Sequence, residues 1–218
     1  MNSYTQVGVE EIANVLVQNG CYINKWQDSV WPVLPDGRQV PVYLSCRNLI
    51  GKPAQRKLIT DAFIRTIQAN YSNVQLIAGL ATAGISWGAM IASQMNLPFV
   101  YVRSSVKTYG IKKSVEGSPK LNQQTLLIDD TYFTGESAQH ASRALAEEAK
   151  AKIIGITTIA NLSTQSHLDE YTPIHSLTYY RSLCDAAYIN NTLDKHQREQ
   201  MLAFYKNTDT YKFEVSHA

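Results

Sequence analysis

Apolar residues recur along this chain at two spacings, which predict helices and strands in alternation. Leu58, Ala62 and Ile67 fall on one face of a helix, whereas short apolar runs such as Val74–Ala81 are typical of buried strands. The predicted helices cover residues 9–16, 53–71, 87–95, 137–150 and 194–205. The predicted strands cover residues 40–44, 74–81, 99–102, 125–128, 153–159 and 175–178.

The order of these elements predicts an α/β domain with a parallel sheet. From Val74 onward strands alternate with helices, and nearly continuous apolar strands are typical of a sheet that helices cover on both faces. Before this region, Pro35-Asp36-Gly37 is a turn signal that predicts a hairpin ending in the strand 40–44, and Tyr22–Trp31 reads as an irregular aromatic stretch. Ligands of such sheets bind beyond the carboxyl ends of the strands, so the residues that follow each strand are of most interest.

Composition narrows the classes of function. The 218 residues carry 20 basic and 18 acidic side chains, a formal net charge of +2, so we expect neither a nucleic-acid nor a membrane partner. Cys21, Cys46 and Cys184 lie too far apart to predict a zinc site or a disulfide framework, and they fit a reducing compartment such as the cytoplasm. We expect no signal peptide and no membrane span, because no run of about 18 apolar residues occurs.

The most informative segment joins the strand 125–128 to the helix 137–150. Two adjacent carboxylates, Asp129 and Asp130, follow the strand, and Thr131-Tyr132-Phe133-Thr134-Gly135-Glu136-Ser137 leads into the helix. Carboxylates there can accept hydrogen bonds from sugar hydroxyls or help to hold a divalent cation, and the turn can bind a phosphate at the helix N-terminus. From the residue types alone a second interpretation is equally open, in which the aspartates cap the loop and the glycine serves the turn.

Leu126–Ser137 resembles the phosphoribosyl pyrophosphate signature of the type I phosphoribosyltransferases, and the resemblance extends over nearly the whole chain in the family's order. Gly79–Ile85 resembles the loop that receives the pyrophosphate. Tyr101–Gly110 with Val115–Gly117 resembles the mobile catalytic loop of the orotate phosphoribosyltransferases. Two further family segments are matched by Pro41–Tyr43 with Arg47 and by Ser176–Tyr180 with the last helix.

The resemblance implies a fold: a single domain over residues 1–218 with a central, mostly parallel sheet flanked by helices. It also implies a small hood from about residues 20–47 and 160–190, and a flexible catalytic loop at about 104–117. In the family this loop reaches the neighbouring subunit, which implies a homodimer. Without the resemblance, the basic residues of 104–117 read as an ordinary solvated loop, and Thr82-Ala83-Gly84 reads as an ordinary turn.

The resemblance also implies a reaction, in which phosphoribosyl pyrophosphate and orotate give orotidine 5′-monophosphate and pyrophosphate in pyrimidine nucleotide synthesis. The implied catalytic residues are Lys107, Arg103 and Asp130. The implied residues for phosphoribosyl pyrophosphate are Arg103, Lys107, Tyr109, Asp129, Asp130, Thr131, Tyr132, Phe133, Thr134, Gly135, Glu136, Ser137, Thr82, Ala83 and Gly84. The implied residues for orotate are Phe133, Val42, Tyr43 and Asn161. The implied cofactor is Mg²⁺, held indirectly through Asp129, Asp130 and the substrate pyrophosphate.

Four residues depart from the family's pattern. Tyr109 stands where the family's catalytic loop has a histidine, and Phe133 stands where the family has a small hydroxyl residue. Glu136 stands where the family's 5′-phosphate loop has a glycine. Asn161 stands where one branch of the family has an arginine that binds the orotate carboxylate. Two other functions therefore stay open: a phosphoribosyltransferase for another base, and a catalytically weakened nucleotide-binding regulator of the same fold. His140, His167, His175 and His196 have neither metal-ligand nor triad spacing, so we assign them no catalytic role.

Overall fold

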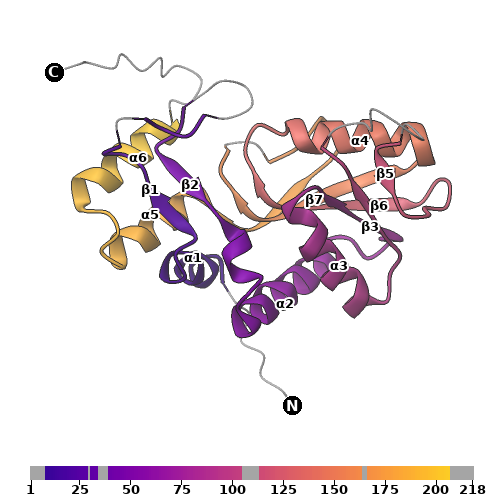
Figure 1. Ribbon diagram of the computed structural model, residues 1–218, viewed down its shortest axis with the longest axis horizontal. Helices are drawn as coiled ribbons and strands as arrows, with labels where there is room; N and C mark the ends of the chain where they lie inside the picture. The colour runs from indigo at the N-terminus through magenta and orange to yellow at the C-terminus, as the bar shows by residue number, and fades with distance from the viewer. Residues whose placement is uncertain (1–7, 29, 34–38, 105–112, 164–165, 207–218) are drawn as a thin grey trace.

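A central sheet covered by helices makes up the larger part of the molecule (Figure 1). The computed structural model describes residues 8–28, 30–33, 39–104, 113–163 and 166–206. Within these residues the sheet has six strands in the order β5-β4-β3-β6-β7-β8. They are β3 (Leu76–Leu80), β4 (Phe99–Val102), β5 (Val115–Glu116), β6 (Gln124–Tyr132), β7 (Lys152–Asn161) and β8 (Ile174–Tyr179). Every neighbouring pair is parallel except β4 and β5, so the predicted α/β fold is confirmed.

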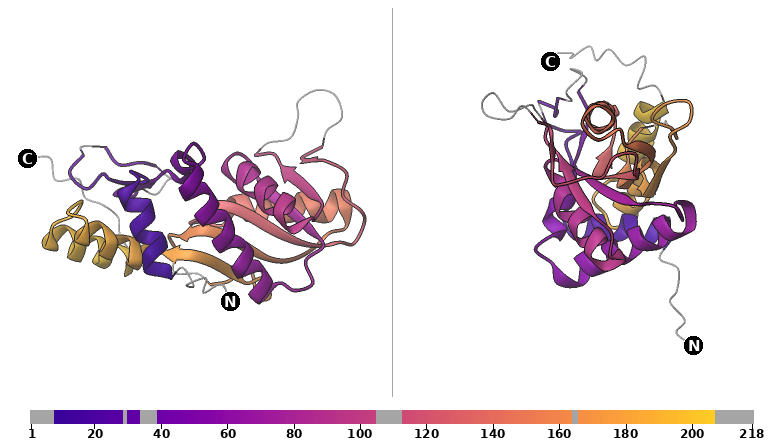
Figure 2. Two further views of the ribbon diagram at one scale, coloured as in Figure 1. Left: turned by 90° about the horizontal axis from the view of Figure 1, so that it is seen from below. Right: turned by 90° about the vertical axis from the view of Figure 1, so that its right-hand side faces the viewer.

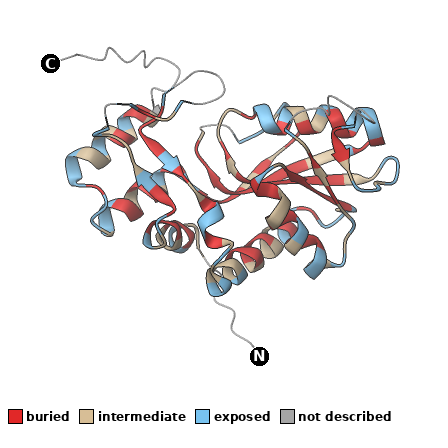
Figure 3. Cartoon of the chain, viewed as in Figure 1, coloured by how far each residue is buried: buried red, intermediate tan, exposed pale blue. Residues whose placement is uncertain are grey.

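Helices cover both faces of this sheet. Helices α2 (Pro53–Asn70) and α3 (Ala83–Met95) lie on one face, and α4 (Glu136–Ala149) lies on the other (Figures 1 and 2). Because successive residues of a strand point to opposite faces, Ile77 packs in the same core cluster as Trp87 of α3, whereas Leu76 packs with Leu145 of α4. All five residues of β3 are buried, as Figure 3 shows for most of the sheet.

A smaller part, the hood, lies beside the sheet (Figure 1). It contains the antiparallel pair β1 (Tyr22–Asn24) and β2 (Val42–Leu44), the 3₁₀ helix η1 (Cys46–Leu49), and the helices α1 (Val9–Gln18), α5 (Tyr180–Ile189) and α6 (Lys195–Lys206). One hydrophobic cluster includes Tyr22 and Tyr180 of the hood as well as Ile77 and Ile128 of the sheet, so the two parts share a core. Strand β8, which lies inside the predicted hood segment 160–190, belongs to the main sheet.

The structure differs from the sequence-based elements mainly where pairing decides the conformation. Residues 22–24 were expected to be irregular, but they form a strand because β2 pairs with them. The short strand β5 and the helix α5 were not predicted. Strand β6 continues past Ile128 to Tyr132, because β7 pairs with it along this length. In the described part of the chain, no helix is both long and apolar enough to cross a membrane.

Candidate active site

The acidic pair lies at the carboxyl end of β6, directly before the start of α4. The Oδ1 atom of Asp129 accepts a hydrogen bond from the backbone N–H of Asp130 at 2.9 Å. The chain then turns at Gly135, whose φ is +81° and where a Cβ would lie 2.5 Å from the hydroxyl of Tyr132. Only glycine is compatible with this turn. Helix α4 begins at the next residue, Glu136, so its unpaired first-turn N–H groups follow the acidic pair closely.

The start of α3 approaches the same strand at backbone contact distance. A Cβ on Gly84 would lie 2.2 Å from the carbonyl oxygen of Ile128, so a larger residue would push the helix away from β6. This close approach places Thr82 and Ala83 beside the acidic pair, after a cis peptide bond between Ala81 and Thr82. Two helix N-termini therefore converge on one place, and such termini favour anionic ligands.

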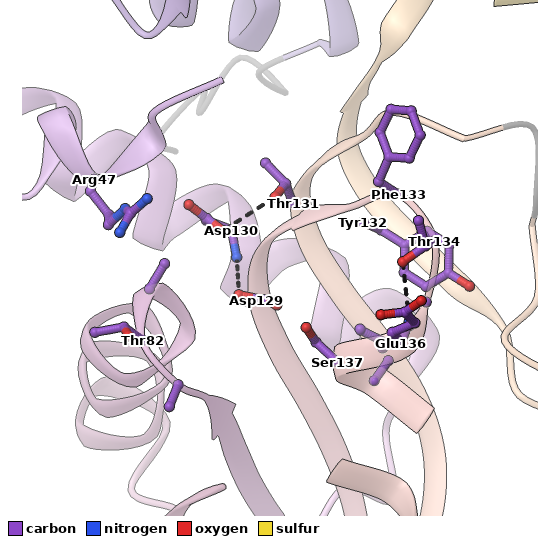
Figure 4. A pocket seen from close by; sticks show the side chains of 15 residues that line it. Arg47, Thr82, Asp129, Asp130, Thr131, Tyr132, Phe133, Thr134, Glu136 and Ser137 are labelled. Atoms are coloured by element: carbon purple, nitrogen blue, oxygen red, sulfur yellow. Dashed lines mark hydrogen bonds between the residues drawn. The ribbon is translucent and has the colours of Figure 1, made fainter. Parts of the chain in front are cut away.

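A cavity of about 280 Å³ unites these elements (Figure 4). Thr82 and Ala83 line it from α3, and the whole segment from Asp129 to Ser137 lines it from β6 and α4. Gly84 does not line the cavity but lies behind these residues, against β6. The structure thus brings together most of the residues predicted to bind phosphoribosyl pyrophosphate, and their binding roles stay predictions.

Burial changes the protonation equilibria of the acidic pair. The side chain of Asp130 is 8% exposed, and burial raises its pKa while the charge of Arg47 acts in the opposite direction. Burial also raises the pKa of Asp129 well above its ordinary value, and the neighbouring Asp130 charge adds to this shift. The charge of Arg47 therefore compensates the two carboxylates only in part, and a bound cation or a donor hydroxyl would stabilise them further.

Arg47 is the one basic residue among the described residues that line this cavity, against the three carboxylates of Asp129, Asp130 and Glu136. It comes from η1, and its Nη2 donates a hydrogen bond to the hydroxyl of Tyr43 at 3.1 Å. In Figure 4 it lies on the Asp130 side of the cavity, far from Glu136. From the sequence, Arg47 could orient a substrate or the hairpin, but a lone arginine is more often a surface ion-pair partner, so it was not among the predicted site residues.

A second cavity, of about 370 Å³, adjoins the first and shares Ala81, Glu136 and Ser137 with it. Its positive residues are Arg103, directly after β4, and Arg143 of α4. A ligand that spans both cavities would meet the acidic pair at one end and Arg103 at the other. Two other predicted residues, Lys107 and Tyr109, lie outside the described residues, as does most of the predicted catalytic loop.

The guanidinium of Arg103 forms one ion pair and also has an N–H donor without a partner in the described part of the chain. Its Nη1 forms an ion pair with Oε1 of Glu116 at 3.5 Å. Its Nε is buried and has no hydrogen-bond partner in the described part of the chain. A buried donor without a partner is costly, so Arg103 keeps unused hydrogen-bonding capacity at the edge of this cavity.

The residues predicted for orotate are dispersed. Val42 is 4% exposed and packs in the hydrophobic core, and neither it, Tyr43 nor Asn161 lines the first cavity. Asn161 is 2% exposed, and its Oδ1 accepts hydrogen bonds from the backbone N–H and the hydroxyl of Ser163 at 2.8 and 3.0 Å. Its side chain therefore stabilises a local turn. A role of these three residues in orotate binding stays a prediction.

Phe133 lines the first cavity but also packs against the hood. It contacts the cluster of Trp31, Val40 and Phe204, and Figure 4 shows its ring pointing away from Asp129 and Asp130. The phenyl group thus joins the turn between β6 and α4 to the hood and leaves the space beside the acidic pair open.

The residues of the cavity can be compared with the ligands that Mg²⁺ requires. Among the described residues, no group of three or more His, Cys, Asp or Glu side chains lies close enough to hold a metal ion without help. Mg²⁺ commonly binds through one or two carboxylates and completes its octahedron with water and substrate phosphates. Asp129 and Asp130, whose charge Arg47 compensates only in part, fit that mode of binding.

The fold is that of the type I phosphoribosyltransferases. The chain superposes on a UMP synthase from Leishmania donovani with a TM-score of 0.75 and 23% identity, over 90% of this chain and 42% of that chain. It superposes on an orotate phosphoribosyltransferase from Aeropyrum pernix with a TM-score of 0.69 and 22% identity, over 80% of this chain and 96% of that chain. At these identities the likeness shows the fold alone.

Sequence similarity goes further. No family model matches the chain. Over 180 residues, however, it is 33% identical to an orotate phosphoribosyltransferase from Streptococcus agalactiae. The aligned region covers 81% of this chain and 84% of the relative. The chain belongs to the orotate phosphoribosyltransferase family.

Proposed function

We propose that this protein transfers the ribosyl 5-phosphate group from phosphoribosyl pyrophosphate to orotate, giving orotidine 5′-monophosphate and pyrophosphate in pyrimidine nucleotide synthesis. The main support is the cavity at the end of β6, where an acidic pair lies between two helix N-termini. The similarity to an orotate phosphoribosyltransferase adds to it. In such a site carboxylates can bind sugar hydroxyls and helix N-termini can bind phosphates. The donor substrate contains both groups.

The donor's two phosphate ends require different partners. The 5′-phosphate suits the turn from Thr131 to Ser137, where first-turn N–H groups of α4 and the hydroxyl of Thr134 are available. The ribose hydroxyls suit Asp129 and Asp130, which accept hydrogen bonds when they are ionised. The pyrophosphate suits the start of α3, at Thr82 and Ala83, together with the guanidinium of Arg103.

The proposed reaction requires stabilisation of the negative charge on the departing pyrophosphate. A ring nitrogen of orotate attacks the anomeric carbon, and the bond from that carbon to the pyrophosphate oxygen breaks. Negative charge then grows on the pyrophosphate, so cations placed there lower the barrier. Arg103 supplies one such cation, and we assign Lys107 the same role because of its place in the resemblance.

We propose Mg²⁺ as the cofactor, held by the donor's oxygens with the help of Asp129 and Asp130. When bound, it would neutralise part of the charge on the departing pyrophosphate. Both the raised pKa values of the pair and the excess of carboxylates over guanidinium groups in the first cavity support a bound cation.

Arg47 is our candidate for the orotate carboxylate. Orotate is an anion that must enter a cavity in which three of the four charged residues are acidic, so a fixed positive group is needed for it. The guanidinium of Arg47 is positioned by Tyr43 and is matched in shape to a carboxylate. This assignment also compensates for Asn161, which lacks a charge and is occupied by its turn.

We also propose a cytoplasmic homodimer in which the catalytic loop of one subunit acts on the other. All three cysteines are free and buried, in keeping with a reducing compartment. The dimer is supported by the resemblance of the segment 101–117. A mixture of Lys107→Ala and Asp130→Asn subunits tests it: activity that returns on mixing supports shared sites, and no recovery from reassembled subunits contradicts them.

The function is tested with a panel of acceptor bases. Purified protein, Mg²⁺ and phosphoribosyl pyrophosphate labelled in the ribose are incubated with orotate, uracil, adenine or hypoxanthine, and labelled nucleotide is measured. We expect orotate to be the one good acceptor. Transfer to another base in place of orotate would contradict the proposal and would support the related enzyme that Phe133 and Asn161 leave open.

A further inference from the structure

Helix α4 holds the chain on both sides of the segment that carries Arg103. The Nε2 atom of His140 lies 3.0 Å from the carbonyl oxygen of Arg103. Since a carbonyl oxygen can only accept, this ring nitrogen carries the proton. The carboxylate of Glu148 accepts two consecutive backbone N–H groups, from Ser114 at 2.7 Å and from Val115 at 3.2 Å.

The hydrogen bonds of His140 and Glu148 fix both the position and the orientation of the chain around Arg103 relative to α4. His140 and Glu148 are separated by eight positions in α4, about 12 Å along its axis. The same helix begins with Glu136 and Ser137, which line both cavities. One rigid element therefore connects the phosphate-binding turn to the strands that carry Arg103.

The connection continues from Glu148 to the guanidinium of Arg103. Glu148 holds β5 at its first residue, and β5 pairs with β4 through Tyr101↔Glu116 and Val102↔Val115. The backbone N–H of Arg103 extends this ladder by donating to the carbonyl of Ser114 at 2.9 Å. The side chain of Glu116 then forms its ion pair with Nη1 of Arg103 at 3.5 Å.

We propose that Glu148 and His140 are positioning residues for Arg103. They hold β5 and the end of β4 so that the guanidinium lies over the second cavity, at a fixed distance from the phosphate-binding turn. This inference rests on the proposed function, in which Arg103 binds the pyrophosphate. A residue that merely stabilises the fold would affect all ligands alike, whereas these residues should affect ligands that reach Arg103.

The test compares two fragments of the donor by calorimetric titration in a buffer containing Mg²⁺. The fragments are pyrophosphate, which requires Arg103, and ribose 5-phosphate, which binds at the acidic pair and the turn. The principal variant is Glu148→Gln, which keeps the shape but loses the second acceptor. The matched control is Glu147→Gln, because Glu147 is exposed on the same helix and forms no hydrogen bond or ion pair within the described structure.

We expect Glu148→Gln to weaken pyrophosphate binding about five- to tenfold, which is less than the full loss of a hydrogen bond from Arg103 because the guanidinium is displaced and not removed, and to change ribose 5-phosphate binding less than about twofold. The control should change neither. In an Arg103→Ala background, Glu148→Gln should cause no further loss, because residues that act through one another are not additive. His140→Ala should weaken pyrophosphate selectively too, and it provides a second variant if Glu148→Gln does not fold.

Three results would overturn the proposal. Glu148 would be a structural anchor only if Glu148→Gln weakened the binding of both fragments equally. The same would hold if Glu148→Gln weakened pyrophosphate binding as much in the Arg103→Ala background as in the wild type. If Arg103→Ala itself leaves pyrophosphate affinity unchanged, both the assignment of Arg103 and this inference are wrong. Turnover of orotate, measured separately, would still support the proposed function in that case.

Discussion

The replacement Asp130→Asn should make the protein more stable and its donor binding weaker. Asp130 is 8% exposed, and burial raises the pKa of its carboxyl group. Between the unfolded and folded pKa values the folded protein therefore binds more protons, so its stability falls as pH rises through this range. Asparagine removes the charge but keeps the oxygen that accepts from the hydroxyl of Thr131 at 3.4 Å.

The two effects have separate magnitudes. Relief of an incompletely compensated buried charge is worth about 1 to 3 kcal/mol in the free energy of unfolding, and Arg47 places this case toward the lower end because it already offsets part of the cost. Loss of one hydrogen bond from a sugar hydroxyl to a charged acceptor costs about 1.5 to 3 kcal/mol of binding, which is about 10- to 150-fold in Kd.

Urea unfolding of the ligand-free protein at pH 8 and at pH 4 measures the first effect. We expect the gain in stability at pH 8 to shrink at pH 4, which is close to the unfolded pKa of about 3.9, because protonation of the folded carboxyl group then relieves part of the same cost. Titration with phosphoribosyl pyrophosphate measures the second. A variant that is less stable at pH 8 and binds the donor as tightly as the wild type would show that Asp130 is a structural cap, and would refute this reasoning.

Three further variants test two residues of the site and one turn outside it. Arg47→Gln should raise the KM for orotate about tenfold and leave the KM for the donor nearly unchanged; equal effects on both would contradict its assignment to the orotate carboxylate. Glu136→Gln, which removes an exposed charge from the phosphate-binding turn, should tighten donor binding up to about fivefold at low salt, and the gain should vanish in high salt. A gain that salt does not change would contradict the electrostatic explanation. The backbone N–H of Tyr171 is the main cause of the lowered pKa of Asp169, so the stability that this carboxylate contributes is present above its unfolded pKa and is lost as pH falls through the folded one. Asp169→Asn should therefore flatten the acid limb of the stability curve measured by urea unfolding, and an unchanged limb would contradict this.

The acidic pair and the turn before α4 were predictable because the sequence signals for them lie within one short segment. A buried strand, two carboxylates, a glycine turn and a helix follow one another within Leu126–Ser137, and each piece has its own sequence signal. The parallel sheet was predictable for the same reason. Its strands and helices alternate, and each repeats an apolar pattern over several residues.

Other features depended on contacts that the sequence does not display. Strands β1 and β5 are short and exist because β2 and β4 pair with them. Glu148 and Ser114 are 34 positions apart in the sequence, so no local sequence pattern predicted their hydrogen bond. Asn161 was noted for its lack of charge, but its function in the fold is a hydrogen-bonded turn with Ser163, which only the structure reveals.

Consumption of orotate is the most direct measurement of the central claim. The loss of its ultraviolet absorbance is followed after phosphoribosyl pyrophosphate is added to the purified protein, with Mg²⁺ present or chelated and with Lys107→Ala alongside. Our account predicts turnover that needs Mg²⁺ and falls by at least about a hundredfold in Lys107→Ala, as expected when a cation at the leaving group is lost. A folded protein that binds the donor yet consumes no orotate would contradict it.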